Sequence, residues 1–492
     1  MNYKQIEEYI LNIPKFRPEG SIEKTRKFYE FLGKPGSSAS IIHVAGTNGK
    51  GSVCAYMNSV LTEAGYKVGM FTSPHLVSVR ERMRINGDLI SKKDFEVYFQ
   101  KLINCAESYN FNPKEPYDNY VDRIEITLQN KDFSEDKYTR ENGSIEGNKT
   151  AQEYRTINNI ETNQIKKNQE YTPTFYEFLF FMAMLYFEEQ NPDVIILETG
   201  LGGRLDATNV IDAPKVAVIT EIGKDHVEYL GDTYEKIAEE KAGIIKPGSC
   251  VVYSRNRQES AQVIERKAKE LGVLCKSVEK VGKQDFRFVD KKIDFSFFSR
   301  YYEYTPIRLN TCAVYQIENA RVALTALEEM GLPISKEAMR RGMLNARWEG
   351  RMEEILPKVY LDGAHNEDGI EAFIESVKND GCKAKRWLLF SVVADKEYIA
   401  MKEKLVESGL FDFIYAAPLK NVRGIGKKEL EYIFDEYKFE DNHKKNKVMI
   451  LDSSYEGLQE ILYLKKEEDI VYITGSLYLA GEIKEHFGGN ND

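Results

Sequence analysis

Residues 43–52 read HVAGTNGKGS, a stretch in which small residues surround one lysine and one serine. Small residues let the backbone curl so that its N–H groups point at one place, and a helix that follows adds its positive N-terminal end. Lys50 would then reach phosphate oxygens, and the hydroxyl of Ser52 would lie near a magnesium ion. The alternative is a glycine-rich turn without a ligand, and Gly51 departs from the common G-x-x-x-x-G-K-S/T spacing. We predict a nucleotide-phosphate cradle made of Gly46, Thr47, Asn48, Gly49, Lys50, Gly51 and Ser52.

A carboxylate follows a second apolar run, in the stretch VIILETGLGGRLDATNVI. Glu198 stands at the end of this run and precedes a glycine-rich turn. In open α/β sheets, ligands bind at the carboxyl ends of the strands. A carboxylate that ends a buried strand is costly unless it has a partner, so we favour a functional role for Glu198 over a solvated turn.

A third run ends in ITEIGKDHVEYLG, which places Asp225 and His226 just beyond a predicted strand. A neutral imidazole can ligate a metal or polarise a phosphate, although a lone histidine is more often structural. Lys241 lies at the end of the next predicted helix, and spacing alone explains it by the helix dipole.

The C-terminal part repeats this arrangement. YLDGAHNEDG places Asp362 and His365 in a turn after a strand, and YITGSLYLAGE places Ser476 before a helix. RWEGRMEE supplies Arg347 and Arg351 between the two parts of the chain. Polar groups at the strand ends of two domains are typical of an enzyme with a cleft.

Short β-branched runs alternate with helical patterns along the chain, which predicts an α/β fold with doubly wound, mostly parallel sheets. Runs near 41–46, 67–73, 193–200 and 215–222 form a first set, and five runs after Trp348 form a second set. We therefore predict two domains, 1–345 and 346–492. A polar insertion at about 110–170, rich in Asn, Glu, Lys and Thr, interrupts the first domain and is expected to be a surface excursion or disordered.

Composition excludes several classes of protein. The net charge of −10 argues against a nucleic acid or a membrane surface as a general partner. The six cysteines are scattered without a CxxC pair, and the first residues are amphipathic and acidic rather than a signal peptide. The longest apolar run, 175–187, is too short to cross a bilayer and contains Glu177. We expect a cytoplasmic protein.

Eight stretches together resemble the folylpolyglutamate synthase/dihydrofolate synthase family, a branch of the Mur ligase superfamily. They occur in family order over nearly the whole chain: HVAGTNGKGSV, FTSPHLVSVRERMRING, LETGLGGRLDATNVI, ITEIGKDHVEYLG, EEKAGIIKPG, RWEGRME, LDGAHNEDG and ITGSLYLAGE. The resemblance implies an N-terminal P-loop ATPase domain of the Mur ligase type and a smaller, Rossmann-like C-terminal domain for glutamate ligation.

The resemblance also implies roles for individual residues. ATP would be contacted by the P-loop and by Asn319, Arg351 and Asp362. Two magnesium sites would use Ser73, Glu198, His226 and a carbamylated Lys241. L-Glutamate would lie near His365 and Ser476. The pterin would lie near Pro74, His75, Thr174, Phe175 and Glu177.

The implied reaction is ATP-dependent amide formation by a monomer. ATP would phosphorylate the γ-carboxylate of a folate, or the carboxylate of dihydropteroate, and the amine of L-glutamate would attack the acyl phosphate. Such a reaction needs positioning and charge neutralisation more than covalent work by the protein.

Two other functions stay open at this point. Cell-wall Mur ligases carry a UDP-binding domain before the P-loop, whereas here only about forty residues precede Gly46. A P-loop ATPase switch is the other alternative, and Arg351 and Asp362 in a second domain favour a ligase over it. Two stretches depart from the family pattern: APLKNVRGIG, with Arg423, and SVVADKEY, which keeps Asp395 and Lys396.

Overall fold

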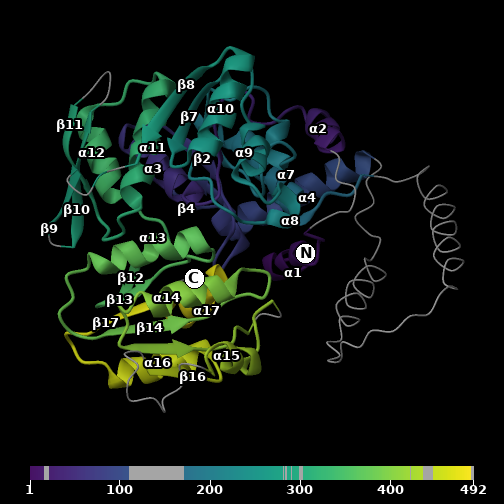
Figure 1. Ribbon diagram of the computed structural model, residues 1–492. Coiled ribbons are helices and arrows are strands. Elements are labelled where there is room, and N and C mark those ends of the chain that lie inside the picture. The colour runs from purple at the N-terminus through teal and green to yellow at the C-terminus, as the bar shows by residue number, and fades with distance from the viewer. Residues whose placement is uncertain are drawn as a thin grey trace, which may run out of the picture.

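The computed structural model describes residues 1–15, 22–109, 171–280, 282, 285–289, 291–298, 303–420, 423–435 and 447–488. These residues form three β-sheets of eight, three and six strands with helices packed around them. In Figure 1 the six-stranded sheet and its helices, coloured green to yellow, lie below the larger part that carries the other two sheets. The predicted insertion at about 110–170 lies outside the described residues.

The eight-stranded sheet carries the predicted strand ends of the first domain. Its order is β4-β3-β2-β5-β1-β6-β7-β8, parallel except for the β2–β3 and β3–β4 pairs. The strands are β1 Ser40–Ala45, β2 Val68–Phe71, β3 Met83–Ile85, β4 Asp88–Leu89, β5 Val194–Glu198, β6 Val216–Ile219, β7 Cys250–Arg255 and β8 Leu274–Glu279. Because β1 lies between β5 and β6, the P-loop that follows β1 is flanked by the residues that follow those two strands.

Both faces of this sheet are covered by helices, which explains why its parallel strands are nearly continuous apolar runs. One face packs on α3 Lys50–Glu63, α11 Gln316–Met330 and α12 Lys336–Asn345. The other face packs on α1 Tyr3–Leu11, α2 Ile22–Phe31, α4 Lys92–Ser108, α7 Phe175–Gln190, α9 Tyr234–Ala242 and α10 Gln258–Leu271. The apolar run 175–187 is the buried part of α7, and among the described residues no helix is long and apolar enough to cross a membrane.

A three-stranded antiparallel sheet was not predicted. It consists of β9 Phe286–Val289, β10 Lys292–Phe298 and β11 Glu303–Leu309. Its apolar side chains, among them Ile293 and Phe295, join the core beside α11 and α12. These strands are short and alternate apolar with charged residues, so their pattern is weaker than that of the buried parallel strands.

The six-stranded sheet has the order β12-β13-β17-β14-β15-β16, parallel except for the β12–β13 pair. Its strands are β12 Glu353–Leu356, β13 Val359–Leu361, β14 Arg386–Phe390, β15 Phe413–Ala416, β16 Lys447–Ile450 and β17 Ile470–Thr474. The helices of this part are α13 Glu367–Lys378, α14 Tyr398–Glu407, α15 Lys427–Ile433, α16 Ser454–Leu464 and α17 Leu477–Gly488. The α/β prediction with mostly parallel sheets is confirmed, and the predicted domain boundary after residue 345 falls between α12 and β12.

Three single-turn helices complete the description near the strand ends. They are η1 Val79–Arg82, η2 Ala207–Val210 and α8 Val227–Leu230. Each follows a strand of the eight-stranded sheet or its connecting loop, so each helps to position the side chains at that edge.

Candidate functional site

The P-loop is held tightly between β1 and α3. Two of its glycines have positive φ, +152° at Gly46 and +87° at Gly49, which is the region that favours glycine. A Cβ at Gly46 would lie 1.8 Å from Thr220 Oγ1, and one at Gly49 would lie 2.3 Å from Asn319 Oδ1. The backbone N–H groups of Thr47 and Asn48 donate to the carbonyl of Glu221 (2.7 and 3.3 Å), which ties the loop to the end of β6.

The unusual glycine of this loop has a packing reason. A Cβ at Gly51 would lie 2.6 Å from Trp348 Nε1, so the indole requires a glycine between Lys50 and Ser52. The hydroxyl of Ser52 is buried and accepts a hydrogen bond from Gln316 Nε2 at 3.1 Å. Lys50 Nζ donates to the carbonyls of Gly46 (3.1 Å) and Thr47, so its ammonium is folded back over the loop.

Glu198 is a buried carboxylate at the end of β5. Its Oε2 accepts a hydrogen bond from the N–H of Ser73 at 2.9 Å, and the Tyr176 hydroxyl donates to its backbone carbonyl. Burial raises its pKa, while Lys50, the Ser73 N–H, Arg351 and Arg82 oppose that shift. Within the described chain its other oxygen, Oε1, accepts no hydrogen bond, so it is available to a ligand.

His226 and Lys241 lie beside the same loop. His226 caps α8 in the left-handed region (φ +51°), and burial, Lys396, Lys50 and Lys241 hold its pKa below the ordinary value. Lys241 is buried at the end of α9, where its Nζ donates to the carbonyl of Gly46 at 2.6 Å. Burial and the nearby ammonium of Lys50 lower the pKa of Lys241 to about 7, so about half of it is an uncharged amine at neutral pH.

The arrangement of possible metal ligands is sparse. Among the residues that the structure describes, no group of three His, Cys, Asp or Glu side chains is placed to hold a metal ion. The predicted metal residues Ser73, Glu198, His226 and Lys241 therefore supply one carboxylate and one imidazole, and a lysine only after modification.

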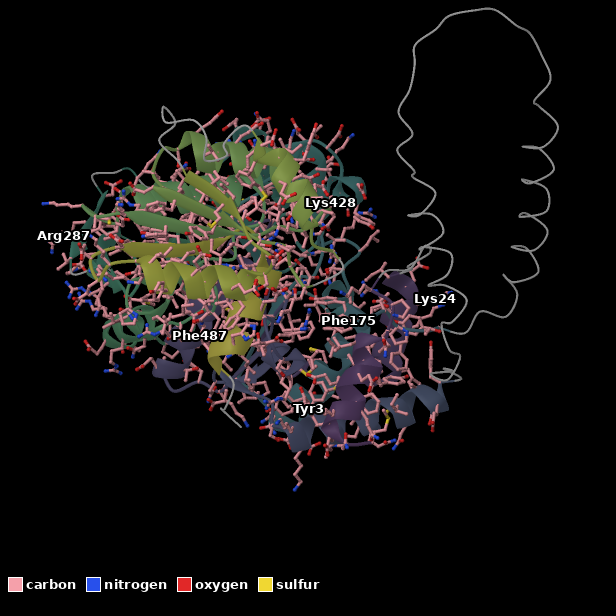
Figure 2. All side chains as sticks on the ribbon, turned by 90° about the horizontal axis from the view of Figure 1, so that it is seen from below. Tyr3, Lys24, Phe175, Arg287, Lys428 and Phe487 are labelled. Atoms are coloured by element: carbon pink, nitrogen blue, oxygen red, sulfur yellow. The ribbon has the colours of Figure 1, made fainter. Side chains whose placement is uncertain are left out.

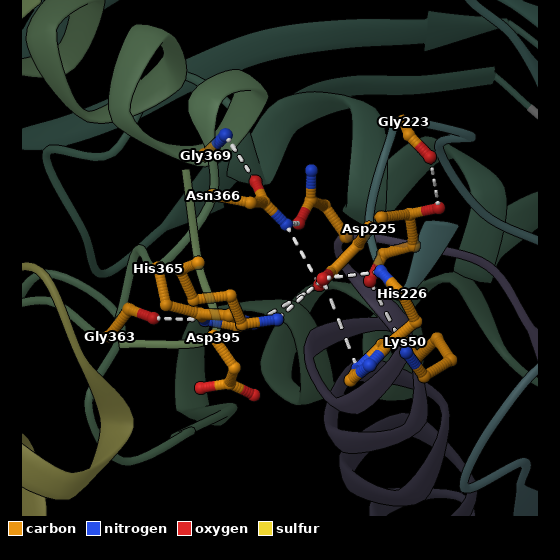
Figure 3. Close-up of polar contacts among 12 residues, drawn as sticks. Lys50, Gly223, Asp225, His226, Gly363, His365, Asn366, Gly369 and Asp395 are labelled. Atoms are coloured by element: carbon orange, nitrogen blue, oxygen red, sulfur yellow. Dashed lines mark hydrogen bonds and ion pairs between the residues drawn. The ribbon is translucent and has the colours of Figure 1, made fainter. Parts of the chain in front are cut away.

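Asp225 joins the two parts of the chain (Figure 3). Lys396 Nζ lies 2.5 Å from Asp225 Oδ1, and His365 Nε2 lies 3.7 Å from Oδ2. Asn366 Nδ2 donates to Oδ2 at 3.4 Å, and in Figure 3 both His365 and Asn366 point toward this carboxylate. Burial would raise the pKa of Asp225, but His365 and Lys396 outweigh it and hold the pKa well below the usual range.

At neutral pH the positive charge beside Asp225 comes from Lys396 and not from His365. Burial lowers the pKa of His365 to about 4, so its imidazole is neutral there. Its Nδ1 lies 2.7 Å from the carbonyl of Gly363, which requires the proton on Nδ1 and leaves Nε2 as an acceptor.

Asp362 and Arg351 bring the six-stranded sheet to the same site. Asp362 accepts hydrogen bonds from the Tyr315 hydroxyl (2.6 Å) and from the N–H groups of Met352 and Ala364. Burial raises the pKa of both Asp362 and Glu198, and the charge of Arg351 opposes the shift at both, so this guanidinium lies near a carboxylate from each part of the chain. Ser476 is buried after β17, where its Oγ accepts a hydrogen bond from the N–H of Tyr478.

The segment predicted to contact a pterin has a partly structural role. Thr174 and Glu177 form a capping box at the start of α7, and Thr25 Oγ1 donates to the other oxygen of Glu177 at 2.6 Å. Phe175 lies toward the middle of the molecule, as labelled in Figure 2, and Arg82 lies over its ring at 5.2 Å from the centroid. His75 accepts a hydrogen bond from Arg82, and it follows Pro74.

Sequence reasoning missed several of these residues. Tyr176, Gln316 and Trp348 contact Glu198, Ser52 and Gly51, but each looks like a core or surface residue in the sequence. Arg82 is one of three arginines in RERMR, and nothing in that pattern says which of them points inward. Glu221 stands two residues after the end of β6, so its place beside the P-loop could have been inferred from the rule that ligands bind at strand ends.

Comparisons with known proteins agree with this geometry. The family described as Mur ligase middle domain matches residues 148–327. The chain is 30% identical over 499 residues to the dihydrofolate synthase/folylpolyglutamate synthase of Bacillus subtilis, with 98% of each chain covered. It is 27% identical to the folylpolyglutamate synthase of Lacticaseibacillus casei, covering 99% of this chain and 98% of the relative.

Solved structures show the same fold. The folylpolyglutamate synthase of Thermotoga maritima superposes with a TM-score of 0.72 at 28% identity, covering 99% of this chain and 97% of that one. Escherichia coli FolC in complex with DHPP and ADP superposes with a TM-score of 0.76 at 24% identity, covering 100% and 99%.

Proposed function

This chain belongs to the folylpolyglutamate synthase/dihydrofolate synthase family, and from that premise we propose that it joins L-glutamate to the γ-carboxylate of a folate in an ATP-dependent reaction. Dihydropteroate is a second acceptor in this proposal, because the Bacillus subtilis relative carries both synthase names. The observation that carries the proposal is the convergence of Lys50, Arg82 and Arg351 on the buried Glu198 beside the P-loop. A reaction between two anions needs such a concentration of positive charge.

The phosphate end of the site is the P-loop. The N–H groups at the start of α3 would hold the phosphates of ATP, because those of Thr47 and Asn48 already donate to Glu221, and the Lys50 ammonium would leave the two carbonyls it now contacts to bind them. ADP is bound in related structures, including the Escherichia coli protein and the Mycobacterium tuberculosis folylpolyglutamate synthase. Asn319, which lies against Gly49, and Asp362, which faces Arg351, complete the proposed ATP contacts.

The bond changes proceed in two steps. A carboxylate oxygen of the acceptor attacks the γ-phosphorus of ATP, which gives an acyl phosphate and ADP. The uncharged amine of L-glutamate then attacks the acyl carbon, the nitrogen loses one proton to water, and the tetrahedral intermediate collapses to an amide as phosphate leaves with the bonding electron pair. The protein supplies positioning and charge neutralisation, and it forms no covalent bond to either substrate.

The glutamate end lies between the two parts of the chain. We propose that L-glutamate binds near His365 and Ser476, on the side of Asp225 and its partner Lys396. His365 Nε2 is unprotonated at neutral pH, so it can accept a hydrogen bond from the amino group of the incoming glutamate and position it. The carbonyl of Gly363 holds the ring through Nδ1–H, and Asp225 Oδ2, 3.7 Å from Nε2, would attract the ring only when the ring is protonated.

Magnesium fits part of this donor set. A buried carboxylate with one free oxygen and the Ser73 hydroxyl are oxygen ligands of the kind that Mg²⁺ prefers, with water completing its shell, and His226 would add a nitrogen. Mg²⁺, when bound by Glu198, Ser73 and His226, would neutralise the charge of the transferred phosphoryl group. We propose two such sites, with Lys241 contributing to one of them as a carbamate.

Lys241 is suited to that modification. About half of its amine is uncharged near pH 7 and can therefore attack CO₂, which forms an N–C bond and releases one proton. The product is a carboxylate at the end of a lysine, and it would reverse the charge beside Gly46 and His226. We also propose a cytoplasmic monomer, which suits six free cysteines.

The proposal is tested by measuring ADP formation with Mg²⁺, ATP and L-glutamate in the presence of tetrahydrofolate, dihydropteroate or neither. ADP that appears only with an acceptor and glutamate together supports the ligase. Turnover with both acceptors would show a bifunctional enzyme, and turnover with tetrahydrofolate alone would show a dedicated polyglutamate synthase. ADP formed at one rate whatever the acceptor would contradict the ligase and favour an ATPase switch.

A further inference from the structure

Arg82 is a buried cation whose hydrogen bonds are mostly unused. The residue is 6% exposed, at the end of η1 and directly before β3. Its Nε donates to His75 Nδ1 at 2.9 Å. Within the part of the chain that the structure describes, Nη1 and Nη2 donate to no acceptor. The two terminal nitrogens are not among the fully buried unpaired atoms, so the four N–H bonds that they carry are accessible and free to bind an anion.

The neighbouring arginines of the same segment differ from Arg82. Arg84 donates to the carbonyls of Glu81 and Gly87, and Arg80 donates to the carbonyl of Ile90. Both are only partly buried and lie over aromatic rings at the surface of their elements, Trp348 and Tyr3. Arg84 and Arg80 therefore have backbone partners, whereas no described group accepts a hydrogen bond from the two terminal nitrogens of Arg82.

The surroundings of Arg82 indicate which part of a ligand an anion bound there would belong to. Its guanidinium lies over the ring of Phe175, 5.2 Å from the centroid, in the segment assigned to the pterin. It is also close enough to Glu198 for the two charges to interact, and Glu198 marks the phosphate end of the site. A ligand that reaches from the aromatic ring toward the P-loop must place its terminal group between these two points.

We propose that Arg82 binds the reacting carboxylate of the acceptor through Nη1 and Nη2 and keeps that contact as the carboxylate becomes an acyl phosphate. This inference rests on the proposed function, which supplies an aryl-linked or glutamyl carboxylate as the acceptor. A guanidinium fork matches the two oxygens of a carboxylate, which a lysine ammonium cannot do. Its charge would also offset the repulsion between the carboxylate and the γ-phosphate as they approach.

His75 positions this fork. The Nε–H of Arg82 occupies His75 Nδ1, so the imidazole proton must be on Nε2. The contact fixes the plane of the guanidinium while the two terminal nitrogens stay free for the substrate.

The test compares two ligands on one protein. The full chain, with a non-hydrolysable ATP analogue, is titrated with an acceptor and with the analogue in which the reacting carboxylate is a carboxamide. Wild type is expected to prefer the carboxylate by about 10- to 100-fold, as for charge-assisted hydrogen bonds. Arg82→Gln should reduce this ratio to about one by weakening carboxylate binding while carboxamide binding stays the same. Arg82→Lys should give a ratio between the two.

Arg80→Gln is the matched control, because it removes the same charge two residues away and should keep the wild-type ratio. If Arg82→Gln keeps the wild-type ratio, or if wild type shows none, the inference is wrong. If Arg82→Gln fails to fold, Arg82→Lys decides, and a wild-type ratio in that variant overturns the requirement for the fork. Acceptor-dependent ADP formation by wild type is measured in parallel. If ADP formation needs the acceptor but the binding ratios do not change, only the inference about Arg82 is wrong. If ADP formation does not need the acceptor, the ligase proposal and the inference are both wrong.

Discussion

Glu198 and Asp225 are both buried carboxylates at the edge of the eight-stranded sheet, yet their surroundings are opposite. Glu198 is near three cations and accepts one hydrogen bond, from a backbone N–H. Asp225 has an ammonium, an imidazole and an amide in contact with it. Burial dominates at Glu198 and raises its pKa, whereas the contacts dominate at Asp225 and lower it.

This difference indicates two different roles, ligand binding at Glu198 and positioning of other side chains at Asp225. A carboxylate whose partners lie at a distance keeps an oxygen for a ligand, and the cations around it keep their charge for phosphate and substrate. A carboxylate whose oxygens are fully used holds other side chains in place. Glu198 therefore belongs to the chemistry, and Asp225 belongs to the junction that carries His365 and Lys396.

The largest expected effect comes from Glu198→Gln. The amide keeps the volume but removes the charge that would hold Mg²⁺, so we expect kcat to fall by about 10³-fold. Thermal stability should stay unchanged or rise, because the variant removes a poorly paired buried charge. Steady-state ADP formation and a thermal melt check both parts, and a fall in stability with unchanged kcat would reverse the assignment.

A smaller loss is expected from Lys241→Ala. Removing the proposed carbamate should reduce turnover by about 10²-fold, and a short carboxylic acid such as acetate should restore part of it. Wild type in CO₂-depleted buffer should show a similar loss that bicarbonate reverses. Activity that does not respond to CO₂ would leave Lys241 as an uncharged amine bound to the carbonyl of Gly46.

Asp225→Asn is expected to act on the junction. It leaves Lys396, whose side chain is 11% exposed, without its carboxylate, so we expect a loss of about 3 kcal/mol in the free energy of unfolding. The Michaelis constant for L-glutamate should rise by about 10-fold while that for ATP changes less. The matched control is Asp395→Asn, because Asp395 pairs with Arg423 at an exposed position and its loss should cost about 0.5 kcal/mol.

The smallest effect is a pH dependence at Glu221. Burial, with the charges of Glu318 and Asp368, raises the pKa of Glu221 to about 7. The folded state therefore keeps a proton that the unfolded state loses between the ordinary carboxyl pKa and about 7, so this group lowers stability as pH rises through that window.

Glu221→Gln removes this penalty. We expect it to raise the free energy of unfolding by roughly 1–2 kcal/mol at about pH 8 and to change it little at about pH 4. Urea unfolding at the two pH values measures this difference. An equal change at both pH values would show that the carboxyl group is not the cause.

Much of the site was predictable because strand ends are visible in the sequence. Buried parallel strands are continuous apolar runs, and Glu198 ends β5, Asp362 directly follows β13 and His226 stands in the loop after β6, at the strand ends where ligands bind. The positive φ angles of Gly46 and Gly49 agree with the tight backbone turn that the small residues of this loop predict.

The rest depended on packing between distant segments. The contact of Trp348 with Gly51 and the capping role of Thr174 and Glu177 require the folded chain. The inward direction of Arg82 depends on η1 and β3, whose short sequences carry no clear period. The strands β9–β11 were missed because alternation over so few residues is a weak pattern.

The most direct measurement follows the oxygen atoms of the acceptor. The enzyme would be given ATP, L-glutamate and an acceptor whose reacting carboxylate is labelled with heavy oxygen, and the released phosphate would be analysed by mass spectrometry. Formation of an acyl phosphate at the cations around Glu198 predicts one heavy oxygen in each phosphate released. Unlabelled phosphate, together with a rate of ADP formation that does not depend on the acceptor, would contradict the formation of an acyl phosphate.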